Sequence, residues 1–164
     1  MSTEEKNKVL SLLNEMKIFY QLIDHPPVFT IEEMDRLQIE HMDKVVKNLF
    51  IRDDKKRSYY IVVMRSDKSV NLKELRRKID SRPLTFASKD DLNTYLGLIS
   101  GEVSPLGAIN DADNIVTVIF DNTLKEYEFI GVHPNDNTAT VFISLDDLVK
   151  VLTAKGQNIL FVDL

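Results

Sequence analysis

Two adjacent polar residues, Lys47 and Asn48, interrupt the apolar run of residues 45–51 and are the strongest chemical signal in the sequence. Alternation along a β-strand would place Lys47 on a face with aliphatic neighbours and Asn48 on the opposite face. Such a lysine usually reaches solvent from an edge strand. Alternatively, its ammonium group could meet an anion in a cleft, such as a phosphate or a developing oxyanion. A buried Asn48 amide would need hydrogen-bond partners, and the strand by itself leaves both interpretations open.

The loop of residues 101–107 carries the pattern Gly-x-x-x-Pro-x-Gly. Gly101 allows a ligand to approach the main chain closely, and Pro105 fixes φ and stiffens the loop. Backbone amides of a stiff loop suit the binding of a developing negative charge. A simple turn between two elements is the commoner use of glycine and proline. Ser104 lies in this loop, but it lacks the Gly-x-Ser-x-Gly setting of a nucleophilic serine.

A second irregular segment, residues 131–137, contains His133 followed by proline and several asparagine and aspartate residues. A turn held by its own Asn and Asp side chains is the ordinary explanation. The alternative is a cluster of small donors and acceptors around a ligand, with Thr138 directly after the segment. The imidazole of His133 could then bind a substrate or act as an acid or base.

Residues 25–30 form a further candidate, because Val28 and Phe29 make an apolar stretch that leads into a capped helix. Thr30 and Glu33 match a capping box, with Thr30 as the N-cap and Glu33 reaching back. Such a stretch usually packs in the core, but it could equally line a small pocket.

The composition excludes several kinds of site. The 164 residues contain no cysteine, which excludes disulfides, thiolate nucleophiles and cysteine-bound metals. His25, His41 and His133 are far apart and have no metal-ligand spacing, so we expect neither a metal nor a cofactor. Apolar runs are too short for a membrane span, and the polar first residues lack a signal sequence. Together these features predict a cytoplasmic protein without a membrane partner.

The charge distribution limits the partners. A net charge of −5 argues against broad, nonspecific nucleic-acid binding, and we expect no DNA partner. Basic residues nevertheless form two groups in the first half of the sequence, whereas the second half is acidic. A solvated face is the simpler explanation for either group alone, but together they favour a polarised surface. The first group is Lys44, Lys47, Arg52, Lys55, Lys56 and Arg57, and the second is Lys68, Lys73, Arg76, Arg77, Lys78 and Arg82.

Hydrophobic periodicity and turn signals predict the elements that position these residues. Helices are expected at residues 3–17, 30–38, 71–79, 88–96 and 144–156. Strands are expected at residues 19–24, 44–52, 58–65, 84–87, 115–120, 126–130, 138–143 and 159–162, with a hairpin between the second and third. This order predicts an α+β protein with a mixed, largely antiparallel sheet and flanking helices, in a single domain of residues 1–164.

Four motifs, taken in order along the chain, resemble those of the YbaK/prolyl-tRNA-synthetase-associated editing domains. They are His25-Pro26-Pro27-Val28-Phe29-Thr30, Lys47-Asn48-Leu49-Phe50, Gly101-Glu102-Val103-Ser104-Pro105, and His133-Pro134 with Asn137-Thr138-Ala139-Thr140. Each motif alone is weak evidence, but the four in register cover essentially the whole chain. The Lys-Asn pair resembles the free-standing ProXp-ala (PrdX) branch, whose members hydrolyse alanine mischarged onto tRNA(Pro).

The resemblance implies a trans-editing aminoacyl-tRNA hydrolase in which water attacks the aminoacyl ester and no protein nucleophile is needed. Main-chain amides between Gly101 and Pro105 would hold the ester carbonyl or the attacking water. Lys47 would anchor the terminal phosphate or the ester region, and His133 would help to position the 3′ end. Asn48 would fix the substrate or its pocket.

The resemblance also implies the partner and the remaining contacts. The expected partner is the alanine-charged acceptor end of tRNA(Pro), with prolyl-tRNA synthetase as a second partner. Val28, Phe29 and Thr30 would form the wall of a pocket that excludes proline, and Ser104 and Thr138 are further substrate-binding candidates. Two alternatives stay open. One is a relative that clears cysteine from tRNA(Pro), and the other is a non-catalytic module that binds an RNA end, a nucleotide or a synthetase.

Overall fold

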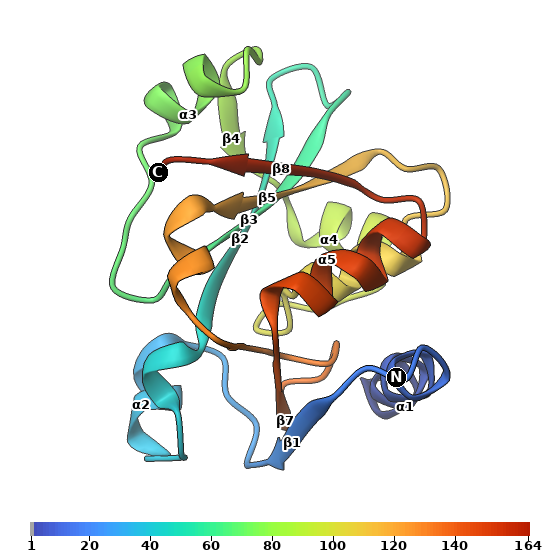
Figure 1. Ribbon diagram of the computed structural model, residues 1–164. Coiled ribbons are helices and arrows are strands. Elements are labelled where there is room, and N and C mark those ends of the chain that lie inside the picture. The colour runs from blue at the N-terminus through green and yellow to red at the C-terminus, as the bar shows by residue number, and fades with distance from the viewer. Residues whose placement is uncertain (1) are drawn as a thin grey trace.

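The computed structural model describes residues 2–164, and its strands form two sheets (Figure 1). The helices are α1 (Ser2–Glu15), α2 (Ile31–Arg36), α3 (Leu72–Lys78), α4 (Lys89–Leu96) and α5 (Leu145–Ala154). Short 3-10 helices are η1 (Met42–Lys44), η2 (Pro105–Asn110) and η3 (Asn122–Glu126). The strands are β1 (Tyr20–Asp24), β2 (Val46–Asp53), β3 (Tyr59–Arg65), β4 (Leu84–Phe86), β5 (Val116–Asp121), β6 (Ile130–Val132), β7 (Ala139–Ile143) and β8 (Asn158–Val162).

The larger sheet has five strands in the order β4-β2-β3-β5-β8. β2 pairs antiparallel with β3, as the predicted hairpin requires, and also with β4. β3, β5 and β8 run parallel to one another. The smaller sheet, β1-β7-β6, is antiparallel throughout. The predicted α+β class with a mixed sheet is confirmed, with the strands divided between two sheets.

Alternate residues of β3 face two different hydrophobic clusters. Ile61 and Val63 join the main core, which also contains buried residues of α1, α4 and α5. Val62 and Met64 join a second cluster together with Leu75 of α3. Because successive side chains of a strand point to opposite faces, helices cover the five-stranded sheet on both sides. In Figure 1, α3 lies at the upper end of this sheet and α2 near its lower end.

Helix α2 begins as the sequence predicts, with one difference in the cap. The hydroxyl of Thr30 accepts a hydrogen bond from the Glu33 amide at 3.1 Å. The Glu33 carboxylate accepts from the amide of Phe29 at 3.0 Å, one residue before the cap. A third cluster of Val28, Met34, Val45 and Phe142 packs α2 against the strands. Phe29 and Thr30 are therefore held at a fixed angle beside the start of β2.

The predicted strand at residues 126–130 is wrong. Residues 122–126 form η3, which Asp121 caps by accepting from the Thr123 amide, and the next strand begins only at Ile130. β5 and β6 do not pair with each other, because β6 pairs with β7 in the smaller sheet. The polar turn after β5 thus leads from one sheet to the other, and a local pattern cannot reveal such a change of partner.

Candidate functional site

A pocket of about 180 Å³ beside the start of β2 brings together most of the residues singled out by the sequence. Its walls come from the segment before α2, from α2 itself, from β2, from the loop after α4 and from the segment after β6. The lining residues are Val28, Phe29, Thr30, Met34, Val45, Val46, Lys47, Asn48, Gly101, Val103 and His133. The predicted candidates Ser104, Pro105 and Thr138 are not among them.

Asn48 lines this pocket and carries an unsatisfied acceptor. Its side-chain oxygen is buried and has no hydrogen-bond partner among the described residues. A buried carbonyl oxygen without a donor costs about 1–3 kcal/mol. A ligand that offers an N–H or O–H donor in the pocket would remove this cost.

Lys47 lies on the opposite face of β2, as the alternation of the strand predicts. Its ammonium group donates to the backbone carbonyl of Lys68. None of the ion pairs found among the described residues involves Lys47. Because an ammonium group has three N–H donors, Lys47 has further donors to offer to an anion. Its charge also attracts an anion, since no carboxylate among the described residues pairs with it.

The loop that begins at Gly101 combines close packing with unused amides. Gly101 has φ +88°, and a Cβ atom there would lie 2.6 Å from Cδ1 and 3.2 Å from Cα of Phe29. The amides of Gly101 and Val103 donate no hydrogen bond to any described residue. Glu102 is buried between them, and its carboxylate accepts from the amide of Ile99 at 3.4 Å. The loop thus contains two main-chain donors without a partner among the described residues, and both belong to residues that line the pocket.

Ser104 and Pro105 are buried and hold the loop in place without lining the pocket. The buried Ser104 hydroxyl donates to the carbonyl of His133 at 2.6 Å and accepts from the Leu106 amide at 3.2 Å. Pro105 begins η2 and is also buried. Ser104 therefore links the Gly101 loop to the segment that carries His133, and its hydroxyl is already used within the protein.

His133 is held as a neutral ring. Its Nδ1–H donates to the carbonyl of Ala139 at 2.9 Å, which leaves Nε2 as the acceptor. Burial lowers the pKa of His133 below its ordinary value of 6.5, and the charge of nearby His25 acts in the same direction. The hydrogen bond to Ala139 and the charge of Asp136 oppose this shift without reversing it. The rings of His25 and His133 lie 6.1 Å apart between centroids.

Thr138 stabilises the segment that carries His133 and does not line the pocket. Its hydroxyl and its amide both donate to the buried carboxylate of Asp136, at 2.7 and 2.8 Å. Asn137 donates from its side chain to the carbonyl of Val28 at 2.9 Å, and so ties this segment to the pocket wall.

Sequence reasoning missed several residues of the site. It did not predict that Asn137 would hold the pocket wall in place, or that Met34, Val46 and Val103 would line the pocket. Their positions in the sequence were the one signal that could have found them. Asn137, Val46 and Val103 are each next to a candidate residue, and Met34 lies about one helical turn after Thr30.

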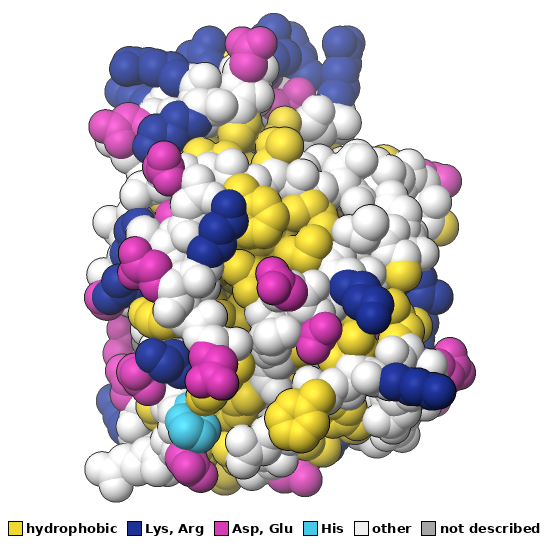
Figure 2. Space-filling model, viewed as in Figure 1, with side chains coloured by type: hydrophobic (Ala, Val, Ile, Leu, Met, Phe, Trp, Pro, Cys, Tyr) yellow, Lys and Arg dark blue, Asp and Glu magenta, His cyan; other side chains and the backbone are white. Residues whose placement is uncertain are grey.

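Several of the clustered basic residues turn out to be paired within the protein. Lys68 contacts Asp121, Arg82 contacts Asp54 and Arg52 lies near Asp91, at N–O distances of 2.7, 2.7 and 3.9 Å. The exposed remainder lies on the β2–β3 turn and on α3, and Figure 2 shows Lys and Arg side chains gathered at this end of the molecule. We call it the basic surface, and it consists of Lys55, Lys56, Arg57, Lys73, Arg76, Arg77 and Lys78.

Residues 2–164 lack two further features. No group of three or more His, Asp or Glu side chains in this range could hold a metal ion. No helix in this part of the chain has the length and apolar character needed to cross a membrane.

The comparisons with known proteins identify the family of the chain. Residues 25–151 match the family model of the aminoacyl-tRNA editing domain. The chain is 47% identical, over the full length of both proteins, to the prolyl-tRNA editing protein ProX of Acetoanaerobium sticklandii. It is 35% identical over 150 residues to prolyl-tRNA synthetase associated domain-containing protein 1 of Danio rerio, covering 90% of this chain and 80% of that protein. The chain therefore belongs to the aminoacyl-tRNA editing domain family.

The fold is shared with a solved structure of low sequence identity. A crystal structure of a protein proposed to be a trans-editing enzyme for prolyl tRNA synthetase superposes with a TM-score of 0.72 at 19% identity, covering 98% of this chain and 96% of that one. At this identity, the likeness shows the fold alone.

The packing of Phe29 on Gly101 yields a first prediction. Gly101→Ala should lower the free energy of unfolding by more than the ~1–2 kcal/mol that a left-handed alanine costs, because its Cβ also collides with Phe29. Urea unfolding measures the loss. Gly156→Ala is the matched control, since Gly156 has φ +79° and a Cβ atom there would meet nothing within 4 Å. An equal loss in the two variants would show that Phe29 does not constrain Gly101.

The buried imidazole yields a second prediction. Folding disfavours the charged form of His133, so the unfolded chain binds more protons near the ordinary pKa of histidine. The free energy of unfolding should therefore fall as the pH drops from about 7 to about 5. In His133→Asn, which can keep a donor toward Ala139, the fall should be smaller. Urea unfolding at several pH values tests this, and the same pH dependence in both proteins would contradict it.

Proposed function

We propose that this protein is a trans-editing aminoacyl-tRNA hydrolase that removes alanine mischarged onto tRNA(Pro). The observation that carries the proposal is the convergence of Lys47, Asn48, Gly101 and His133 on one pocket. It is supported by the 47% identity to a prolyl-tRNA editing protein along the entire chain. The proposed domain comprises residues 1–164, and prolyl-tRNA synthetase is a proposed second partner.

The reaction is ester hydrolysis, and each group has a role that its surroundings allow. Water attacks the carbonyl carbon of the aminoacyl ester, and the unused amides of Gly101 and Val103 stabilise the oxyanion of the tetrahedral intermediate. The bond between the carbonyl carbon and the ribose oxygen then breaks. The ribose oxygen takes the proton that the water gives up, and free alanine leaves the tRNA.

The side chains hold the substrate in place for this attack. The ammonium group of Lys47, which forms no ion pair with a carboxylate of the described residues, binds the phosphate of the terminal nucleotide or the ester region. The acceptor oxygen of Asn48 receives a donor from the substrate, either the α-ammonium group of the amino acid or a ribose hydroxyl. The unprotonated Nε2 of His133 accepts from the other ribose hydroxyl and so helps to recognise RNA.

The size of the pocket supports a small amino acid. A volume of about 180 Å³, with Val28, Phe29 and Met34 in the wall, leaves little room beside the end of a nucleotide. A synthetase pocket built for proline cannot strongly reject alanine, because a missing methylene is worth only ~1–3 kcal/mol. A second and smaller pocket supplies the missing discrimination. Cysteine is the nearest competitor in size, and the assay below separates the two.

The basic surface supports an RNA partner. α3 packs through Leu75 on the face of the sheet that contains Ile51, and Lys47 lies on this face of β2. β2 has eight residues and so extends for roughly 25 Å, from the pocket at one end to the basic turn at the other. A helical RNA stem whose 3′ end enters the pocket can reach this positive charge with its phosphates.

Deacylation of charged tRNA(Pro) tests the proposed function. We expect hydrolysis of Ala-tRNA(Pro), much slower hydrolysis of Pro-tRNA(Pro), and a fall in kcat/KM of about 10²-fold in Lys47→Ala, as for loss of one transition-state donor. Lys150→Ala is the control, because Lys150 is exposed on α5 and does not line the pocket.

Three outcomes would change the account. Preferred hydrolysis of Cys-tRNA(Pro) would assign the protein to cysteine clearance. Binding of tRNA(Pro) without hydrolysis of any charged form would make it a non-catalytic binding module. Native activity in a folded Lys47→Ala variant would remove Lys47 from the site.

A further inference from the structure

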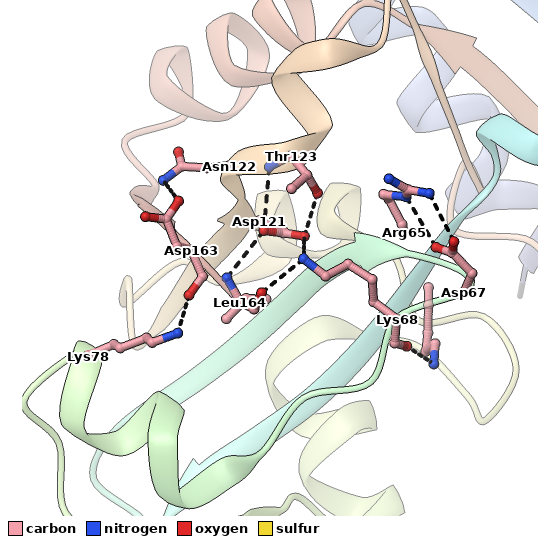
Figure 3. Close-up of polar contacts among 10 residues, drawn as sticks. Arg65, Asp67, Lys68, Lys78, Asp121, Asn122, Thr123, Asp163 and Leu164 are labelled. Atoms are coloured by element: carbon pink, nitrogen blue, oxygen red, sulfur yellow. Dashed lines mark hydrogen bonds and ion pairs between the residues drawn. The ribbon is translucent and has the colours of Figure 1, made fainter.

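A buried carboxylate outside the pocket collects four hydrogen bonds. Asp121 at the end of β5 is fully buried. One of its oxygens accepts from the ammonium group of Lys68 at 2.7 Å and from the hydroxyl of Thr123 at 2.6 Å. The other accepts from the amides of Thr123 and Leu164 at 3.4 and 3.3 Å (Figure 3). Burial would raise the pKa of Asp121, but these donors, chiefly Lys68, hold it below its ordinary value.

Lys68 connects this carboxylate to the pocket. Its ammonium group binds Asp121 and also donates to the carbonyl of Leu164 at 2.9 Å. Its own backbone carbonyl accepts the hydrogen bond from Lys47. The side chain of Lys68 is thus fixed at the sheet, while its main chain fixes the side chain of Lys47.

The segment around Lys68 has a second anchor. Residues 66–71 join β3 to α3 and contain no regular secondary structure. The Lys68 amide donates to the carbonyl of Arg65 at 3.1 Å. The guanidinium group of Arg65 binds both carboxylate oxygens of Asp67, at 3.1 and 2.9 Å (Figure 3). The Lys68–Asp121 pair is the contact that ties this segment to β5.

The strand directions explain why the network reaches the site. The parallel strands β3, β5 and β8 end at the same edge of the sheet, where Arg65, Asp121 and Val162 are their last residues. β2 runs antiparallel to β3 and pairs Lys47 with Met64, so β2 begins at this edge. Parallel sheets commonly place ligand sites beyond the carboxyl ends of their strands.

Within the described residues, Lys68 and Lys47 differ in how their charges are paired. Asp121 is neutralised by Lys68, so the buried pair carries no net charge. Lys47 is held by a neutral carbonyl instead of a carboxylate. A carbonyl fixes the direction of an ammonium group without cancelling its charge, and so preserves its attraction for a substrate phosphate.

We propose that Lys68 and Asp121 are positioning residues for the editing reaction, because they fix the carbonyl that orients the ammonium group of Lys47. This proposal rests on the proposed function, in which Lys47 contacts the substrate. Lys68 and Asp121 touch no substrate atom themselves. Their effect on the reaction passes through Lys47 alone.

A double-mutant cycle with Lys47→Ala and Lys68→Met tests the proposal. In the otherwise native protein, Lys68→Met should lower kcat/KM for Ala-tRNA(Pro) on the order of 10-fold to 100-fold, as a small misplacement of a reacting group does. In the Lys47→Ala background, the same change should have almost no further effect. A purely structural role would lower activity by the same factor in both backgrounds, and that result would overturn the proposal.

Two further variants keep the test decisive. Lys6→Met is the matched control, since it removes a lysine that contacts Asp24 at 2.8 Å and has no link to Lys47, and it should keep native activity. If Lys68→Met does not fold because it leaves a buried charge unpaired, Asp121→Asn takes its place in the cycle. Native activity in folded Asp121→Asn or Lys68→Met would also overturn the proposal.

A crystal structure of the folded variant separates this proposal from the proposed function. Loss of the contact between Lys47 and the carbonyl of residue 68 is the expected result whether or not the protein deacylates tRNA. An unchanged Lys47 position would contradict positioning by the pair, whereas a lack of deacylation by the native protein would contradict only the proposed function.

Discussion

The register of β2 against β3 is the constraint on which the site depends. It pairs Lys47 with Met64 and Asn48 with Val63, so the two polar side chains leave the sheet on opposite faces. A shift of one residue would exchange them, and would place a lysine in the main core beside Val46 and Phe50. Burial of alternating aliphatic residues on both faces therefore fixes the positions of Lys47 and Asn48.

The second constraint is the connection between the two sheets. A single parallel bridge joins Val45 to Gly131, and a side chain at Gly131 would collide with Val45 and Phe142. Hydrogen bonds from Ser104 to His133 and from Asn137 to Val28 link the three irregular segments around the pocket. Several polar groups of these segments thus bind one another. Among the described residues, the side-chain oxygen of Asn48 and the amides of Gly101 and Val103 find no partner, and we assign these groups to the substrate. The buried side-chain oxygen of Asn135 also has no partner there, and we assign it no role.

Much of this arrangement could be predicted from local sequence. The alternation around Lys47 and Asn48, the cap at Thr30 and the hairpin are short-range features, and the structure contains them. The strand expected at residues 126–130 failed because pairing partners far along the chain determine where β6 begins. Ser104 and Thr138 could not be separated from lining residues, because only the folded structure shows that their hydroxyls bond to His133 and Asp136. The role of Lys68 was also hidden, because its ion pair spans 53 positions.

The central claim is that the pocket beside β2 holds the aminoacylated end of tRNA. The most direct test is an NMR titration of the isotope-labelled protein with a stable amide analogue of 3′-alanyl-adenosine. The account predicts that backbone shift changes concentrate at Asn48, Gly101, Val103 and His133. Shift changes confined to another part of the molecule, such as the cavity between Phe129 and Phe142, or no changes at saturating analogue, would contradict it.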